Sequence, residues 1–264
     1  MVSRLRPIMA VLLLVLALPC RSECGKLVLS ADPDYQPLHW YDGERLRGAS
    51  IDLATHILDD LKIPYEVRYL GPWKRVLAVA ASGGIDMVAT LKMLPEREAY
   101  LSYVRTPAFP NPVAVFINRQ HSFVYHHWGD LVDKRGGVAL GNRFSAEFDK
   151  FAEGNLHLEE AGNADTNFRK LAAGRIDYVI TGLLTGETWL ARHRQSEHFV
   201  AVRPFITEDK NYFAFVKGNP CGQYAEAFEA RLKELVKADV NLHILNMHLM
   251  QLDIKLDSAT LSRR

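Results

Sequence analysis

The sequence predicts an α/β fold made of two related lobes. Segments with the spacing of strands and of helices alternate along most of the chain. One helix–glycine–strand pattern occurs twice, at residues 80–90 and 172–181. Of the 264 residues, about 240 follow the amino-terminal leader described next, a length that suits one large domain or two modest lobes.

The first 22 residues have the layout of a secretory signal peptide. A positively charged start is followed by an apolar run over residues 8–18, and then by small or polar residues. We expect cleavage after Ser22 and a periplasmic location. We also expect a soluble mature chain, because no later segment has the run of about 18 apolar residues that a membrane-spanning helix needs. A lipoprotein signal that uses Cys20 is the alternative, but Leu18-Pro19 before it fits such processing poorly.

The charge of the chain is nearly balanced. Lys and Arg number 32 against 31 Asp and Glu, and removal of residues 1–22 takes away three arginines and no acid, which leaves 29 against 31. A chain so balanced has no gross electrostatic reason to bind nucleic acid or an anionic membrane. We therefore expect neither as a partner.

Cleavage also changes the cysteine count. Of three cysteines, Cys20 lies in the leader, so Cys24 and Cys221 remain in the mature chain. Two cysteines in an oxidising compartment predict a disulfide bond. Two free thiols are the alternative.

The order of strands and helices follows from periodicity and from residues that begin or end helices. Strands are predicted over residues 26–30, 65–69, 85–90 and 137–140. Helices are predicted over residues 51–61, 72–82 and 166–173, and another is predicted to begin at residue 145. A last helix is predicted over residues 224–236, where the apolar residues form one face. Ser50 is expected to cap the first helix, Pro72 suits the first position of the second, and Gly83 ends it.

The repeated pattern places three kinds of residue in matching positions. Each copy has a glycine that can adopt the left-handed conformation, then Asp86 or Asp177, and then an apolar strand that ends in Thr90 or Thr181. Ligands of open α/β sheets bind beyond the carboxyl ends of strands. The two threonines are therefore expected to face a cleft from opposite lobes, unless this common unit recurs by chance.

Six short motifs in order carry a family resemblance. They are residues 32–37 (DPDYQP), 46–48 (LRG), 51–54 (IDLA), 72–73 (PW), 95–97 (PER) and 174–177 (GRID). Together they resemble family 3 of the bacterial extracellular solute-binding proteins, the periplasmic amino-acid receptors of ABC importers. The resemblance runs over residues 26–249.

The resemblance implies a type II periplasmic binding protein fold, in which two α/β lobes are joined by a two-segment hinge with a ligand cleft between them. We expect the crossings at residues 107–112 and 204–211. Lobe one then comprises residues 26–109 and 210–264, and lobe two residues 110–209. Closure about the hinge would bury the ligand and expose a surface for the membrane permease of an ABC importer. We expect a monomer, by resemblance alone.

The resemblance also implies ligand-binding residues. Arg97 matches the arginine that holds a ligand carboxylate, and a guanidinium suits two-point contact with that group. Tyr35 and Trp73 are expected to pack on the ligand, and Thr90 to offer its hydroxyl. A surface role for Arg97 and a core role for the two aromatic side chains are the alternatives.

Ligand chemistry departs from the family pattern. Lys92, and Asn142 with Arg143, stand where relatives offer hydroxyl groups, and Gly182 after Thr181 stands where relatives carry the aspartate that pairs with an α-ammonium. A buried ammonium needs an anion. The loss of this aspartate, together with the gain of Lys92 and Arg143 beside Arg97, makes the cleft more positive and slightly favours an anionic organic acid as the ligand.

The alternative ligand is an ordinary amino acid whose ammonium is held by Asp32 or Glu187, with Lys92 and Arg143 solvated.

No catalytic, metal or cofactor site is predicted. The pairs His126-His127 and His243 with His248 lack the spacing of metal ligands, and no catalytic or nucleotide-binding glycine motif stands in the required context. An enzyme similar to cyclohexadienyl dehydratases, with a carboxylic acid in the cleft, is one alternative function. A free-standing sensing partner of a membrane receptor is another.

Overall fold

A computed structural model describes residues 23–254, so the predicted signal peptide and its cleavage site lie outside the described residues. The strands are β1 (Leu27–Ser30), β2 (Asp34–Tyr35), β3 (His39–Tyr41), β4 (Leu46–Arg47), β5 (Tyr65–Val67), β6 (Met87–Lys92), β7 (Leu101–Tyr103), β8 (Phe109–Asn118), β9 (Arg135–Ala139), β10 (His157–Ala161), β11 (Tyr178–Gly182) and β12 (Phe199–Val216). The α-helices are α1 (Ala49–Asp60), α2 (Trp73–Ala81), α3 (Ala146–Asn155), α4 (Ala164–Ala172), α5 (Leu183–Arg192), α6 (Ala225–Lys237) and α7 (Val240–Gln251). Short 3-10 helices are η1 (Pro95–Arg97), η2 (Arg119–His121), η3 (Trp128–Leu131) and η4 (Pro220–Tyr224).

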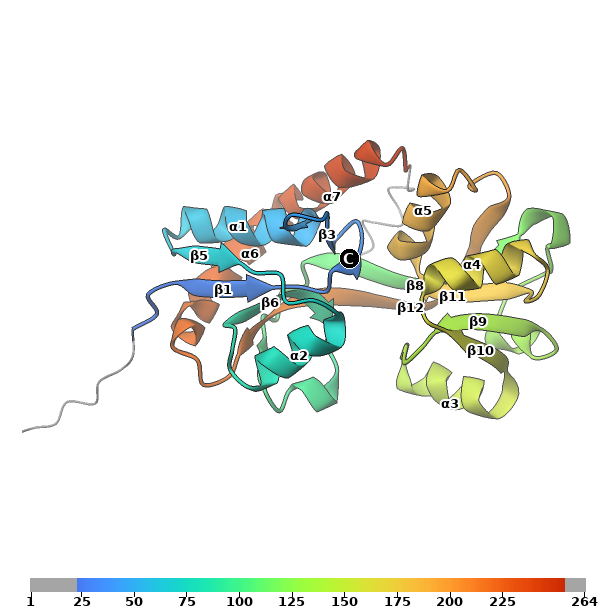
Figure 1. Ribbon diagram of the computed structural model, residues 1–264, viewed down its shortest axis with the longest axis horizontal. Helices are drawn as coiled ribbons and strands as arrows, with labels where there is room; N and C mark the ends of the chain where they lie inside the picture. Colours follow the sequence, from blue (N-terminus) through green and yellow to red (C-terminus); the bar gives the residue numbers. More distant parts are fainter. Residues whose placement is uncertain (1–22, 255–264) are drawn as a thin grey trace, which may run out of the picture.

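The two halves of the molecule have the same strand arrangement (Figure 1). In one half, β5, β1 and β6 are parallel neighbours, and β12 lies antiparallel beside β6. In the other half, β10, β9 and β11 are parallel neighbours, and β8 lies antiparallel beside β11. Because β8 and β12 also pair with each other, one hydrogen-bonded series of strands crosses both halves. The predicted α/β fold is confirmed.

The repeated sequence pattern occupies equivalent places in the two halves. Gly83 and Gly174 follow α2 and α4 in the left-handed region, with φ of 76° and 65°. Asp86 then accepts a hydrogen bond of 2.8 Å from a backbone N–H of β1, and Asp177 accepts one of 2.7 Å from a backbone N–H of β9. Each aspartate directly precedes a strand (β6 or β11) and therefore ties the start of that strand to its parallel neighbour, a structural role that the matching positions did not reveal.

The long strands β8 and β12 join the halves. Their ladder runs from Phe199 opposite Asn118, in one half, to Asn211 opposite Phe109, in the other. Both predicted crossings, at residues 107–112 and 204–211, overlap these strands. The lobe boundaries after residues 109 and 209 stay a prediction.

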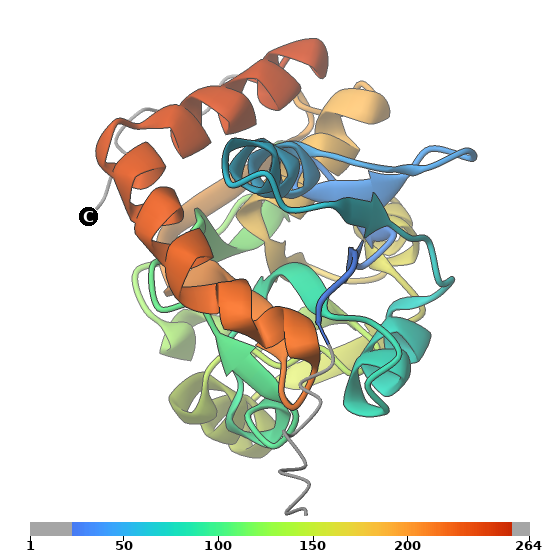
Figure 2. The same cartoon turned by 90° about the vertical axis from the view of Figure 1, so that its left-hand side faces the viewer.

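Helices cover the sheet of the first half on the side of α1. There α6 and α7 pack against α1, and Figure 2 shows both running along that side of the molecule. The sequence prediction missed α7 because its apolar residues surround the helix instead of forming one stripe: Leu245 is buried, whereas Met247 and Met250 are exposed. Among residues 23–254, no helix is long and apolar enough to cross a membrane.

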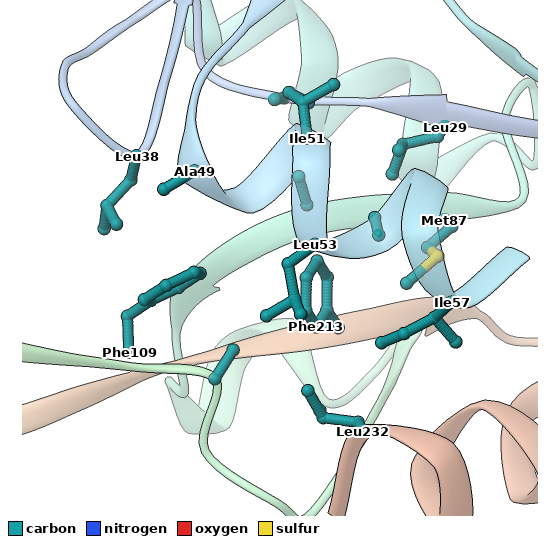
Figure 3. Close-up of a cluster of buried hydrophobic side chains, with 14 of the residues drawn as sticks. Leu29, Leu38, Ala49, Ile51, Leu53, Ile57, Met87, Phe109, Phe213 and Leu232 are labelled. Atoms are coloured by element: carbon teal, nitrogen blue, oxygen red, sulfur yellow. The ribbon is translucent and has the colours of Figure 1, made fainter. Parts of the chain in front are cut away.

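The largest buried cluster lies between this sheet and these helices. Figure 3 shows its centre, where Leu29, Ile57, Met87, Phe213 and Leu232 come from β1, α1, β6, β12 and α6. All five side chains are fully buried. Strands and helices distant in sequence therefore share one core, which fixes the strand ends that carry the candidate site.

The start of α1 differs from its prediction. Ser50 was expected to cap the helix, but α1 begins after Gly48, whose φ is 122° and where a Cβ would overlap the Leu38 carbonyl. The Ser50 hydroxyl instead lies 2.5 Å from the Thr90 hydroxyl of β6. The capping prediction is wrong because a partner across the core competes for the side chain. Pro72 precedes α2 instead of occupying its first position.

The predicted disulfide bond is present. Cys24 and Cys221 are joined across a sequence separation of 197 residues, which ties the segment before β1 to η4. A crosslink over so long a loop restricts the unfolded chain strongly.

We expect the double variant Cys24→Ser, Cys221→Ser to lose about 2–5 kcal/mol of unfolding free energy in urea denaturation, because its unfolded chain regains the entropy of the open loop. Wild-type protein treated with a reductant is the control, and its stability should fall to that of the variant. A double variant as stable as the oxidised protein would show that the bond does not constrain the chain.

Candidate functional site

The predicted site residues lie where strands of the two halves end. In the first half they are Asp32 and Tyr35 after β1, Trp73 at the start of α2, Thr90 and Lys92 at the end of β6, and Arg97 in η1. In the second half they are Asn142 and Arg143 after β9, and Thr181 and Gly182 at the end of β11. This is the location at which α/β sheets bind ligands.

Arg97 is held between an aromatic ring and a strand end. Its guanidinium carbon lies 5.6 Å from the centre of the Trp73 ring, and its Nη1 donates a 3.2 Å hydrogen bond to the Lys92 carbonyl oxygen. A guanidinium has five N–H donors in one plane, so the side chain keeps donors for a carboxylate. The structure therefore brings Arg97, Trp73 and Lys92 together, and their binding of a ligand stays a prediction.

Lys92 has a partner that the sequence reasoning did not identify. Its ammonium forms an ion pair with Asp209 of β12, with 20% of the Lys92 side chain and 35% of the Asp209 side chain exposed. Asp209 lies within the predicted second crossing, in an unbroken run of polar residues over positions 207–211. A polar run inside a segment expected to join two lobes is the signal that could have drawn attention to it. The positive charge of Lys92 is therefore balanced.

His39 joins the two segments that carry site residues. The imidazole is buried, and its nitrogens lie 2.8 Å from the carbonyl oxygens of Asp32 and Thr90. A neutral ring can donate to only one of these oxygens, whereas a protonated ring donates to both. His39 was not recognised from the sequence, because its two partners become neighbours only when β1 and β6 pair.

The Asp32 carboxyl group carries a cost of burial. Burial raises its pKa, whereas electrostatic interactions with His39 and Arg97 and a 3.0 Å hydrogen bond from the Asp34 N–H act in the opposite direction. The site thus contains a carboxyl group for which desolvation outweighs its charged neighbours.

Tyr35 points its hydroxyl group toward the hinge strands. The hydroxyl donates a 2.5 Å hydrogen bond to Asn111 Oδ1 of β8, and burial raises the pKa of Tyr35 to about 12. Asn211 of β12 also faces this hydroxyl, although its Nδ2 makes no hydrogen bond of good geometry within residues 23–254. The expected packing of Tyr35 on a ligand stays a prediction.

Gly182 lies against this tyrosine. A Cβ built on Gly182 would sit 3.5 Å from the Tyr35 hydroxyl and 3.7 Å from Asn111 Oδ1. Thr181 before it is buried. The position at which relatives were expected to carry an aspartate is therefore adjacent to a hydroxyl–amide pair from β2 and β8.

Three predicted residues are placed away from these contacts. Thr90 is buried with its hydroxyl beside Ser50, so the hydroxyl is not presented to solvent. Asn142 and Arg143 are exposed on the loop after β9, where Arg143 Nη1 donates 3.1 Å to the Asn142 carbonyl. Among the described contacts none joins Arg143 to Arg97 or Lys92.

The halves also touch beside the site. Arg192 of α5 donates a 2.8 Å hydrogen bond to Gln36, and Leu184 of the same helix belongs to the core cluster of the first half. The end of β11 and the loop after β1 are therefore neighbours in this conformation. As for metals, no group of three or more His, Cys, Asp or Glu within residues 23–254 could hold an ion.

Comparisons with known proteins agree with this geometry. The family model of the bacterial extracellular solute-binding proteins, family 3, matches residues 27–240. A search of curated proteins finds no match.

Three solved structures show the same fold at low sequence identity. A variant of the arginine-binding protein ArgBP from T. maritima is 17% identical, with a TM-score of 0.68 over 86% of this chain and 96% of that chain. A histidine kinase sensor domain with similarity to periplasmic binding proteins is 21% identical, with a TM-score of 0.69 over 85% and 96%. An ancestral arginine-binding protein bound to arginine is 23% identical, with a TM-score of 0.67 over 84% and 97%. The predicted type II periplasmic binding protein fold is confirmed.

We expect Asp32→Asn to raise the melting temperature at pH 7. Because the folded pKa of Asp32 lies above its ordinary value of 3.8, the charged carboxylate costs stability at neutral pH, and protonation removes that cost as the pH falls toward 3.8. The difference between variant and wild type should therefore shrink in melting curves recorded at successively lower pH.

Asp42→Asn is the matched control, for which the expected change in stability at pH 7 has the opposite sign. Backbone N–H groups of Arg45 and Glu44 lower the pKa of Asp42 to about 2, so loss of its charge should reduce stability at pH 7. A lower melting temperature for Asp32→Asn at pH 7 would contradict the burial argument.

Proposed function

Because the chain belongs to family 3 of the bacterial extracellular solute-binding proteins, we propose that it captures an amino acid in the periplasm and delivers it to the permease of an ABC importer. The observation that carries this proposal is the placement of Arg97. Its guanidinium is oriented by Trp73 and by the Lys92 carbonyl at the end of a strand, which suits two-point binding of a ligand carboxylate.

Capture would use the two strands that join the halves. We propose that residues 26–109 with 210–264, and residues 110–209, move as lobes about β8 and β12 and enclose the ligand. The contacts of Arg192 with Gln36 and of Gly182 with Tyr35 would then belong to the closed arrangement. Closure would also create the composite surface that the permease recognises.

The Cys24–Cys221 disulfide supports a periplasmic location, because such bonds persist in oxidising compartments. Export by the signal peptide predicted over residues 1–22 would deliver the chain there.

The charges of the site support an amino acid more than a purely anionic acid. The prediction of an organic acid depended on Lys92 and Arg143 adding to Arg97, whereas Lys92 is paired with Asp209 and Arg143 is exposed. Two of the similar structures are named as arginine-binding proteins, and one of them holds arginine. An α-amino acid fits both observations.

The first test is a thermal-shift screen of the secreted protein against amino acids and organic acids. A ligand that binds only the folded state raises the melting midpoint by mass action. Arg97→Gln should weaken the best ligand by about 10–100-fold in calorimetry, since charge-assisted hydrogen bonds to its carboxylate are lost.

Arg231→Gln is the control, because that guanidinium pairs with Asp60 and Glu234 outside the site, and its affinity should equal that of wild type. A panel in which no member raises the midpoint would refute the proposed function.

A further inference from the structure

The two joining strands and the end of β6 present a row of polar side chains on one face of the sheet. Asp209 lies opposite Asn111, and Asn211 lies opposite Lys92. Directly paired residues of antiparallel strands point to the same face, as do residues two apart on one strand. We call this row the hinge floor; its members are Lys92, Asn111, Thr207, Asp209 and Asn211.

Tyr35 defines the face to which the hinge floor belongs. Its hydroxyl bonds to Asn111, and Asn211 faces the same hydroxyl. The hinge floor therefore borders the loop after β1 and the start of α5, between the residues of the two halves that were predicted to bind a ligand.

Polar atoms in the hinge floor lack partners. Thr207 Oγ1 and Asn211 Nδ2 are buried and make no hydrogen bond within the described part of the chain. Buried polar groups are usually paired, so orphan atoms indicate a place for water or a ligand. Here they flank Asp209 along β12.

Asp209 is a more suitable acceptor for a cation than Asp32. Asp32 already accepts a hydrogen bond from the Asp34 N–H, and its charged form is penalised by burial. The Asp209 side chain is about a third exposed, although the Oδ2 atom that faces Lys92 is buried, and its partner is an ammonium group on a flexible chain. A second ammonium could replace that of Lys92 and leave the carboxylate paired, provided that the flexible Lys92 chain turns its buried ammonium out to solvent, so that neither charge is left buried and unpaired.

We propose that Asp209 binds the amino group of the ligand, and that Lys92 is the resting partner which this amino group displaces. The inference rests on the proposed function and narrows it, because it requires a ligand with a free amino group near the carboxylate held by Arg97. Asn211 and Thr207 then complete the polar surroundings of that amino group with their unpaired atoms.

The experiment separates this role from that of a structural ion pair. Asp209→Asn and Lys92→Met are made in the full chain, and the secreted proteins are compared with wild type by calorimetry. The probes are L-glutamate with glutarate and L-arginine with 5-guanidinopentanoate, each pair differing only in the α-amino group. Circular dichroism melting curves verify that both variants fold.

Wild type should bind each amino acid that it recognises more tightly than the deaminated partner. Asp209→Asn should lose about 10–100-fold toward the amino acid and leave the deaminated acid unchanged, because the acceptor of the amino group loses its charge. Lys92→Met should instead bind the amino acid about 2- to 5-fold more tightly, because no internal ammonium competes for Asp209.

Three results would overturn the inference. Equal weakening by both variants toward both members of a pair would show that the ion pair is structural. An unchanged preference for the amino acid in Asp209→Asn, or its loss in Asp32→Asn instead, would assign the amino group to another acceptor. A wild-type protein that binds glutarate or 5-guanidinopentanoate as tightly as the matching amino acid would show that the amino group is not recognised, whereas the proposed function itself is refuted only by failure of the whole thermal-shift panel.

Discussion

The antiparallel ladder between β8 and β12 is the interaction on which the rest of the structure depends. Each strand completes the sheet of one half, and their pairing extends from Phe199 opposite Asn118 to Asn211 opposite Phe109, with a shift of register between Val202 and Thr207. The register of this ladder fixes how the strand ends of the two halves meet. It also determines that Asn111 and Asp209 lie opposite each other on one face, beside Tyr35.

Charges around the candidate site are compensated by segments distant in the chain. Lys92 of β6 pairs with Asp209 of β12, while Arg97 lies over Trp73 and lowers the cost of burying Asp32. Asp32 keeps a raised pKa despite this help, so the folded chain retains a group that opposes stability at neutral pH. Such a local cost in stability is typical of a binding site, because the residues that bind a ligand best are often not those that would make the ligand-free protein most stable.

Local signals predicted well where one segment contains all the interacting groups. The glycines after α2 and α4 adopt the left-handed conformation that a helix end requires, and Ser145 caps α3 by accepting from the Phe148 N–H. Ser50 shows the limit of such signals, because its hydroxyl bonds to Thr90, 40 residues away, instead of capping the helix in whose first turn it lies. Helix α7 was missed for a related reason: its apolar residues serve the core of the whole half and form no single stripe.

The sequence by itself determined the α/β class, the two related halves, the cysteine pair and the candidate position of Arg97, because periodicity, helix-end residues and short motifs lie within single segments. The tertiary structure decided the partners of the side chains in the site. Tyr35 bonds to Asn111 across a separation of 76 residues, and Lys92 finds Asp209 on another strand. Those pairings depend on the register of strands brought together only by folding, and a shift of one residue would turn each side chain to the opposite face of the sheet.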